Sequence, residues 1–308
     1  MLTKFIFRVG LAAVTTISLI SCSDKEPSTA ENPKASSDAV FIISAIPDEK
    51  ITDQEPKFQK VAAYLSDKLG VKAEFQFSKD YADAVTKFKN GEAHLVWFGG
   101  LSGVQARMAV EGSEAIAQGK ADPQYKSYFI AHKDVPIKES ADFPTAIQDM
   151  TFTFGSPGST SGRLMPTYFI MENTGGKSPD EWFKTKPIFQ MSGGHVATAN
   201  AVADGTVQIG ALNYKTYDSL LESDEKVKAN TKRIWTTPFY ADYNWTIHPD
   251  AKAAFGGDFF QKVQDALVAA QPGDGVLEAI NRKAIIPAKS EEFEGIKDVA
   301  VKVGLIEE

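Results

Sequence analysis

The chain has 308 residues, of which 43% are hydrophobic and 24% are charged. This is ordinary globular composition, and it excludes a collagen-like, coiled-coil or wholly disordered chain. The 33 basic and 40 acidic residues give a net charge of −7. An acidic chain argues against nucleic acid as a partner, because phosphate contacts require clustered Lys and Arg, but it is compatible with a small anionic ligand held by local backbone dipoles. The single cysteine excludes intrachain disulfides and cysteine-based zinc sites.

Residues 1–21 are a predicted export signal. Lys4 and Arg8 provide a positive start, and residues 9–21 form a mostly apolar run that is too short to cross a bilayer as a stable anchor. The run ends directly before Cys22 and resembles the bacterial lipoprotein signal. That resemblance implies that Cys22 becomes the first mature residue and carries acyl chains, palmitate among them, that fix it to a membrane. A plain signal peptide with an incidental cysteine is the alternative.

Residues 22–38 are predicted to be a lipidated, disordered tether. From residue 23 onward the segment has no aromatic and no large aliphatic side chain. Such a segment cannot bury enough surface to offset the entropy lost on ordering. The folded part is therefore expected to start near Ala39.

The first part of the folded chain is predicted to alternate strands and helices. Strands are expected at residues 39–46, 71–77 and 93–98, with helices between them that end at Gly70 and at Gly91, and a further helix from Gly99 to about Val110. Three strands joined by two helices predict a right-handed parallel unit. Ligands of such sheets bind beyond the carboxyl ends of the strands.

A second unit follows the same pattern. Strands are expected at residues 151–154, 187–190 and 207–212, with intervening helices that reach Asn173 and Ala203. Residues 234–240 and 245–248 are predicted to run back as strands, and residues 257–308 to be helical with short breaks. The second unit is thus predicted to be inserted into the first. We expect lobe 1 to comprise residues 39–133 and 239–308 and lobe 2 residues 134–238, joined by a two-segment hinge around a central cleft.

The strongest local motif is GSPGSTSG, residues 155–162, between a predicted strand and a predicted helix. Hydroxyl side chains cap the first N–H groups of a helix. The same hydroxyls and N–H groups can converge on a tetrahedral anion, favoured by the helix dipole. A purely structural N-cap is the alternative. The motif is not a nucleotide-binding P-loop, because no Lys follows the glycines.

At this point the chain resembles a known family, the phosphate- and phosphonate-binding proteins of ABC importers. The resemblance covers roughly residues 39–300. It depends on Ile43 to Pro47 at the end of the first strand, on Trp97-Phe98-Gly99, on Thr153-Phe154-Gly155 before Ser159-Thr160-Ser161-Gly162, and on Ser192 to His195. It implies a periplasmic-binding-protein-like α/β fold of two lobes.

The resemblance also implies the site. In the family, the residues equivalent to Ser159, Thr160 and Ser161 hold the phosphonate oxygens, and the equivalent of His195 points into the cleft. Phe98 stands where phosphonate binders usually have Tyr, so it is expected to form an apolar wall. Asn213 and Tyr214 lie where the family places further ligand contacts.

The remaining polar candidates are weaker. His94, His132 and His248 are isolated from each other and from carboxylate pairs, so no metal site is expected. A serine hydrolase using Ser159 or Ser161 with His195 is the enzymatic alternative, but the motif is not Gly-x-Ser-x-Gly and no Asp partner for His195 is visible. We therefore expect a binding protein, with no catalytic residue and no cofactor.

The sequence thus predicts a lipid-anchored solute-binding protein on the periplasmic side of the bacterial envelope. We expect a monomer that captures phosphonate, phosphite or phosphate and delivers it to the transmembrane subunits of an ABC permease. Selenate or sulfate is the alternative ligand, because Phe98 replaces the usual Tyr and no carboxylate is assigned to the site, although Asp48 could reach the cleft mouth. A ligand without protons would need a site of donors alone, whereas neutral His195 could accept a hydrogen bond from a protonated one.

Overall fold

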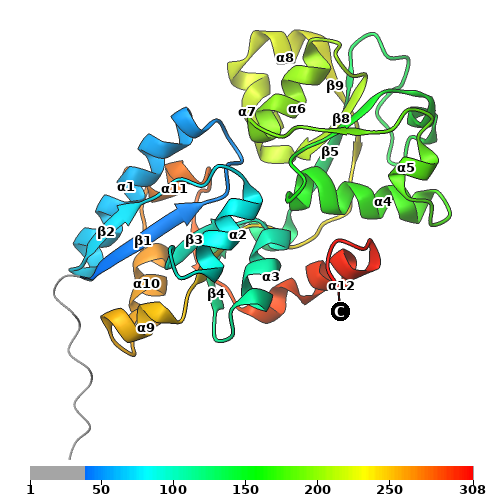
Figure 1. Cartoon of the computed structure of the whole chain (residues 1–308). Helices are drawn as coiled ribbons and strands as arrows, with labels where there is room; N and C mark the ends of the chain where they lie inside the picture. The colour runs from blue at the N-terminus through cyan, green and yellow to red at the C-terminus, as the bar shows by residue number, and fades with distance from the viewer. Residues whose placement is uncertain (1–38, 308) are drawn as a thin grey trace, which may run out of the picture. The chain divides into compact units, whose positions relative to one another are not determined.

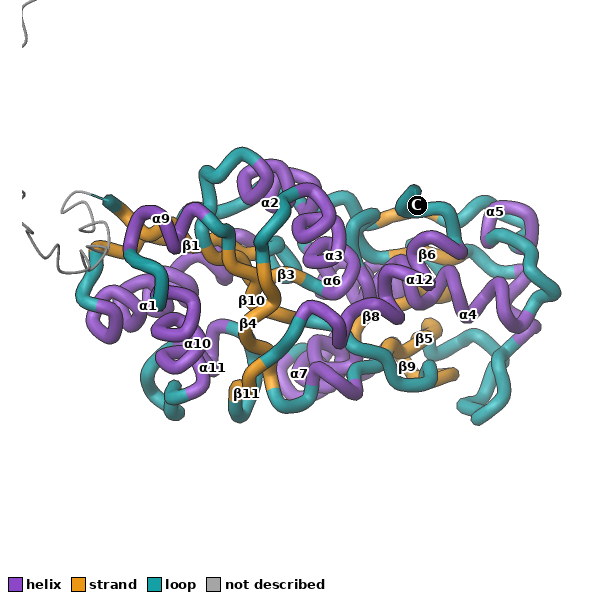
Figure 2. The backbone as a smooth tube through the Cα atoms, turned by 90° about the horizontal axis from the view of Figure 1, so that it is seen from below, coloured by secondary structure: helices purple, strands orange, loops and turns teal. Residues whose placement is uncertain are grey.

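The computed structural model describes residues 39–307 (Figure 1). The predicted signal peptide, Cys22 and the predicted tether lie outside the described residues. Within residues 39–307, no helix is long and apolar enough to cross a membrane. The described chain forms two sheets, each flanked by helices, and this confirms the predicted two-lobed α/β architecture (Figure 2).

The first sheet has six strands in the order β11-β4-β10-β3-β1-β2. The strands are β1 (Val40–Ala45), β2 (Lys72–Phe75), β3 (Leu95–Phe98), β4 (Glu114–Gly119), β10 (Asn244–Ile247) and β11 (Ile285–Pro287). β1 pairs in parallel with both β2 and β3, as predicted. β10 returns from late in the chain and pairs antiparallel with β3 and β4.

The second sheet has five strands in the order β7-β6-β8-β5-β9. The strands are β5 (Ser127–His132), β6 (Phe152–Phe154), β7 (Ile188–Phe189), β8 (Ile209–Asn213) and β9 (Thr231–Thr236). β6 is parallel to β7 and β8, which confirms the predicted second unit. β5 is antiparallel to β8 and β9.

Helices cover both sheets. Those of the first lobe are α1 (Ile51–Leu69), α2 (Tyr81–Lys89), α3 (Gly100–Ala109), α9 (Asp250–Phe255), α10 (Phe259–Val268), α11 (Val276–Ala279) and α12 (Glu294–Lys302). Those of the second are α4 (Met165–Asn173), α5 (Pro179–Trp182), α6 (Gly194–Ala203), α7 (Tyr214–Ser223) and α8 (Glu225–Asn230). Short helical turns are η1 (Asp122–Gln124), η2 (Thr145–Asp149), η3 (Thr160–Leu164) and η4 (Ser290–Phe293). The apolar spacing in residues 58–69 produces the buried face of α1, which Gly70 ends in the left-handed conformation.

Two sequence expectations were wrong. Residues 257–308 are not entirely helical, because β11 pairs with β4 at the edge of the first sheet. The strand expected at residues 234–240 is β9, which lies earlier at Thr231–Thr236 and leaves residues 237–243 extended between the sheets. β4 and β5 were not predicted, because each follows a helix or turn without a clear period-two pattern.

The chain passes between the two sheets twice, in residues 120–126 and 237–243, and these crossing segments pair with each other. The Tyr125 N–H donates to the Tyr240 carbonyl at 2.8 Å, and the Tyr240 N–H donates to the Tyr125 carbonyl at 3.0 Å. Each sheet has its own apolar core. Two cores joined by two paired segments are the geometry of a two-segment hinge.

Candidate ligand-binding site

The Ser159–Ser161 turn forms a closed, buried loop at the end of β6. The Ser159 hydroxyl accepts a hydrogen bond from the Gly162 N–H at 3.0 Å, which is the N-cap predicted from the motif. The Gly155 N–H donates to the Gly162 carbonyl at 2.8 Å. A Cβ on Gly155 would lie 3.2 Å from the Gly162 Cα, so the two glycines permit this close approach. All three hydroxyl residues are at most 2% exposed.

Thr160 connects this turn to the first lobe. Its hydroxyl oxygen accepts a hydrogen bond at 2.9 Å from the N–H of Leu101, in the first turn of α3. The neighbouring N–H of Gly100 donates to Asp242 Oδ1 at 2.9 Å. The Asp242 carboxylate and the Thr160 hydroxyl lie side by side, because a Cβ on Gly99 would be 3.1 Å from Thr160 Oγ1 and 3.3 Å from Asp242 Oδ1. The start of α3 therefore meets one hydroxyl and one carboxylate rather than solvent.

Asp242 is a buried carboxylate with an unused oxygen. It is 1% exposed, and its Oδ2 has no hydrogen-bond partner among the described residues. Burial raises the pKa of Asp242 to about 7, and Asp122 adds to the rise, whereas the hydrogen bonds from Gly100 and Thr160 and the charge of Arg282 oppose it. The sequence analysis did not single out Asp242.

His195 lies in the first turn of α6, directly beside the Ser159–Ser161 turn. A Cβ on Gly162 would be 3.2 Å from the His195 Cε1. The Nδ1 of His195 accepts a hydrogen bond from the Asn213 N–H at 3.3 Å, so the proton of the neutral ring is on Nε2. That Nε2 is buried and has no hydrogen-bond partner within residues 39–307. Burial lowers the pKa of His195 to about 4, so near neutral pH the ring offers an N–H donor at Nε2, and the expectation that neutral His195 accepts a ligand proton was wrong.

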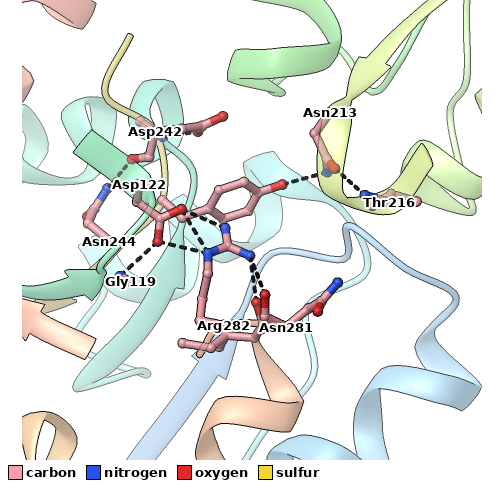
Figure 3. Close-up of polar contacts among 11 residues, drawn as sticks. Gly119, Asp122, Asn213, Thr216, Asp242, Asn244, Asn281 and Arg282 are labelled. Carbon is pink, nitrogen blue, oxygen red and sulfur yellow. Dashed lines mark hydrogen bonds and ion pairs between the residues drawn. The ribbon is translucent and has the colours of Figure 1, made fainter. Parts of the chain in front are cut away.

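Asn213 and Tyr214 lie at the end of β8 and the start of α7. The Asn213 Oδ1 accepts from the Thr216 N–H at 2.7 Å and so caps α7, while its Nδ2 donates to the Tyr243 hydroxyl at 3.2 Å (Figure 3). Tyr214 is half-buried and packs edge-on against Tyr125, with ring centroids 4.9 Å apart. Both predicted residues thus contact the crossing segments.

The structure places Phe98 in the core of the first lobe. Its side chain is fully buried and packs edge-on against Phe88 at 5.6 Å. Adjacent strand residues point to opposite faces of a sheet. The neighbouring Trp97 accordingly stacks on Tyr243, with ring centroids 5.4 Å apart.

Tyr81, the first residue of α2, reaches the turn from the first lobe. Its side chain lies against the turn, and burial raises its pKa well above the usual range. Tyr81 also packs tightly against the second lobe, because a Cβ on Gly158 would be 2.6 Å from the Tyr81 Cβ. Tyr81 was also missed in the sequence. Its only local signal is a polar aromatic residue beyond the second strand.

A second carboxylate, that of the half-buried Asp48, lies beyond the end of β1. Its carbonyl accepts from the His195 N–H at 3.3 Å. Its carboxylate accepts from Gln54 Nε2 at 3.2 Å. Burial raises the pKa of Asp48 to about 7, and Glu49 adds to the rise. Asp48 therefore contacts both lobes, as its position in the sequence suggested.

A buried ion pair supports the tyrosines of the crossing segments (Figure 3). The Arg282 Nε donates to Asp122 Oδ1 at 2.9 Å and Oδ2 at 3.0 Å, and the Gly119 N–H donates to Asp122 Oδ2 at 2.8 Å. The guanidinium carbon lies 4.9 Å from the Tyr243 ring centroid and 5.2 Å from that of Tyr125. These distances are those of cation–π contacts.

A cavity of about 740 Å³ opens between the lobes next to the turn. Its wall includes Glu49, Lys50 and Tyr81 from the first lobe and Ser156, Gly158 and Ser192 from the second. The residues predicted to bind the ligand do not line this cavity. Tyr81 and Gly158, which line the cavity, also adjoin the turn.

Other polar side chains contact groups of the fold. The Nδ1 of His94 accepts from the Ile42 N–H at 3.0 Å, and the Nδ1 of His248 accepts from the Asp250 N–H at 3.1 Å. Arg163 lies over the Phe154 ring, 4.6 Å from its centroid. Among residues 39–307, no three His, Cys, Asp or Glu side chains gather as a metal site. The hydrogen bond from Asn213 occupies the His195 nitrogen that a catalytic triad would pair with a carboxylate.

Known proteins resemble this chain over most of its length. Residues 43–293 match the family described as ABC transporter, phosphonate, periplasmic substrate-binding protein. The chain is 33% identical over 281 residues to a probable ABC transporter phosphite binding protein, PhnD1, of Prochlorococcus marinus, covering 89% of this chain and 93% of the relative. It is 27% identical over 286 residues to the phosphate-import protein PhnD of Mycolicibacterium smegmatis, covering 85% of each. The solved structure of the Prochlorococcus protein with methylphosphonate superposes with a TM-score of 0.81, covering 87% of this chain and 99% of that one.

Proposed function

This chain belongs to the periplasmic substrate-binding proteins of phosphonate ABC transporters, and we propose that it binds its anion at the Ser159–Ser161 turn between the two lobes. Proteins of this family bind and deliver a substrate rather than transform it, so the chain is not an enzyme. The proposed ligand is a tetrahedral phosphorus oxyanion, that is, a phosphonate, phosphite or phosphate. The named ligands of its relatives, phosphite, phosphate and methylphosphonate, support that class.

The observation that carries this proposal is the unpartnered Nε2–H of His195 beside the turn. A buried donor without a partner costs about 1–3 kcal/mol. An anion bound to the Ser159–Ser161 hydroxyls and N–H groups would accept from His195 as well. The Tyr81 hydroxyl, next to the turn, would add a donor from the other lobe. Such converging donors hold a multivalent anion by charge-assisted hydrogen bonds.

Closure of the lobes is the proposed binding step. Three contacts join the lobes at the turn: Leu101 to Thr160, Tyr81 to Ser159, and His195 to Asp48. An anion that touches residues of both lobes binds the closed state better than the open one, and this difference drives closure. We propose residues 120–126 and 237–243 as the hinge, with the lobes bounded as expected from the sequence. Asn213, Tyr214 and Phe98 would surround the site rather than provide its main donors.

We also propose that the protein is a monomer fixed by lipid at Cys22 to the periplasmic side of the envelope. The support is the lipoprotein-type sequence before Cys22 and the polar, low-complexity residues 23–38. A tether of this composition would let the binding protein reach the transmembrane subunits of its ABC permease.

Isothermal titration with phosphite, methylphosphonate and phosphate tests the proposed ligand class. We expect at least one of the three to bind and to raise the melting temperature of the protein. Ser161→Ala should weaken this binding, because it removes a hydroxyl from the turn. Ser178→Ala, at the start of α5, is the matched control and should bind as the wild type does. If none of the three anions binds the wild type, the proposed function is wrong.

A further inference from the structure

We propose that Asp242 selects anions that carry a proton, by accepting a hydrogen bond from the bound ligand at its free oxygen, Oδ2. This inference builds on the proposed function and names the subset of oxyanions that the site takes. It assigns the choice of ligand to Asp242, which lies in the proposed hinge segment and adjoins the Ser159–Ser161 turn.

The position of Asp242 supports this role. It lies in the crossing segment just before β10, and its carboxylate lies close to Thr160, the central residue of the turn. The contacts of Gly99 show the same closeness: a Cβ there would lie 3.1 Å from Thr160 Oγ1 and 3.3 Å from Asp242 Oδ1. Oδ1 is used by the Gly100 N–H, whereas Oδ2 is buried and unpartnered among the described residues.

The site then combines groups that only donate hydrogen bonds with one carboxylate that only accepts them. His195 Nε2–H and the backbone N–H groups of the turn only donate, and the hydroxyls can do either. An ionised carboxylate only accepts. Phosphite and phosphonate monoanions carry one hydroxyl, which can donate to Asp242 Oδ2. Sulfate carries none near neutral pH, so its oxygens would face the carboxylate as two buried, unpaired acceptors that repel each other.

The proton in this pair is available near neutral pH. Burial raises the pKa of Asp242 to about 7, so the carboxylate and the anion can share a single proton. The charged neighbours are Asp122 and Arg282, and these belong to the ion pair described above. Tyr81, Tyr125, Tyr240 and Tyr243 also face this region, but burial raises their pKa values well above 10. Asp48 titrates in the same range as Asp242, and His195 titrates below it.

The test compares Asp242→Asn with Asp48→Asn. Both substitutions remove one carboxylate whose pKa is raised to about 7, but the Asp48 carboxylate accepts a hydrogen bond from Gln54, whereas Asp242 Oδ2 has no partner among residues 39–307. Affinities for methylphosphonate, phosphite and sulfate are measured by isothermal titration at pH 7, where part of each phosphorus anion still carries a proton and Asp242 is partly ionised. We expect the wild type to prefer the phosphorus anions. Asp242→Asn should shrink the ratio of methylphosphonate to sulfate affinity by about ten- to a hundredfold, because one charge-assisted hydrogen bond is lost and one repulsion removed.

Asp48→Asn should leave that ratio within about threefold of the wild-type value, on the scale of affinity changes. A ratio unchanged in Asp242→Asn, an equal change in Asp48→Asn, or a wild type that binds sulfate as tightly as methylphosphonate would each overturn the inference. These results leave the proposed function intact, which fails only if no phosphorus anion binds. Should Asp242→Asn not fold, the wild type alone decides: its sulfate affinity must rise as the pH falls below 7, and a flat profile overturns the inference.

Discussion

The hydroxyl of Thr160 accepts a hydrogen bond at 2.9 Å from the N–H of Leu101, so the central residue of the ligand turn caps a helix of the opposite lobe. A capping hydroxyl usually belongs to the chain segment just before its helix. Here 59 residues separate the two partners in the sequence. The Thr160 hydroxyl therefore contributes to closure of the lobes and, under the proposed function, to ligand binding.

Replacing this hydroxyl should weaken both roles. We expect Thr160→Val to lower methylphosphonate affinity by about tenfold or more, which is the effect of one lost hydrogen bond in a desolvated site. Thr167→Val is the matched control, because the Thr167 hydroxyl is also buried but donates only to the Arg163 carbonyl within its own helix. Isothermal titration of both variants measures the difference. Equal losses in the two variants would contradict a special role for Thr160.

Closure should also depend on Gly158. A Cβ there would lie 2.6 Å from the Tyr81 Cβ, a distance that real Cβ atoms do not tolerate. Gly158→Ala should therefore push the lobes apart and reduce ligand affinity by roughly tenfold or more, which is over 1.4 kcal/mol. Gly257→Ala is the control, because a Cβ at Gly257 meets nothing within 4 Å. Small-angle scattering should show a larger radius of gyration for Gly158→Ala than for Gly257→Ala, and equal radii would exclude this mechanism.

The stability of the ligand-free protein should fall in acid because of His195. Its pKa is lowered to about 4 in the folded state and lies near 6.5 in the unfolded chain. Between these values the unfolded chain binds the extra proton, so the stabilisation is complete above pH 6.5 and is lost as the pH falls towards 4. The size is about 3 kcal/mol. Denaturant unfolding of the wild type and of His195→Gln between pH 4 and 7 should show a shallower acid loss in the variant.

Asp242 should act in the opposite direction. Its pKa is raised to about 7, so the folded protein binds the extra proton between pH 3.8 and 7. Its contribution therefore favours folding at low pH and is lost as the pH rises through 7. Asp242→Asn should remove this loss from the same unfolding series. A variant with the wild-type slope between pH 4 and 7 would show that the carboxylate does not titrate there.

The Asp122–Arg282 pair should be costly to break from one side. Asp122→Ala leaves a buried guanidinium without its carboxylate, and we expect a loss of about 3–5 kcal/mol in the free energy of unfolding. In a matched cycle, the double variant Asp122→Leu with Arg282→Met should lose less than the sum of Asp122→Leu and Arg282→Met made singly. Urea unfolding of the wild type and these three variants gives the coupling energy. Additive losses would mean that the two side chains do not depend on each other.

Membrane attachment should depend on Cys22. We expect the mature protein to partition into the detergent phase of Triton X-114, and Cys22→Ser to remain in the aqueous phase because it cannot carry the acyl chains. A third variant, Ser21→Ala, keeps the cysteine and serves as the control. If wild type and Cys22→Ser partition alike, the proposed anchor is wrong.

The sequence predicted what is encoded locally. The parallel strand units, the stops at Gly70 and Asn90-Gly91, and the capped turn at Ser159 each depend on neighbours within a few residues. The family resemblance added His195, which the structure places against the same turn.

Long-range features were beyond the sequence. Asp242 meets Gly100 only because β10 inserts between β3 and β4, and no local pattern encodes that order. Tyr81 belongs to the site only once the lobes are in contact. The sequence also could not show on which face of the sheet the Phe98 side chain lies. A strand buried on both faces has no alternation of apolar and polar residues that would indicate it.

Ser127, the first residue of β5 after one crossing segment, donates its hydroxyl to the Ser161 carbonyl at 2.6 Å and lies 2.6 Å from the Tyr240 hydroxyl of the other. The Ser159–Ser161 turn is therefore one hydrogen bond from the crossing segments, which form the proposed hinge about which the lobes would rotate. Rotation displaces each atom in proportion to its lever arm. A swing wide enough to open the mouth of the cleft would shift the turn very little, so the anion would stay seated on the second lobe until the last contacts from the first lobe had gone.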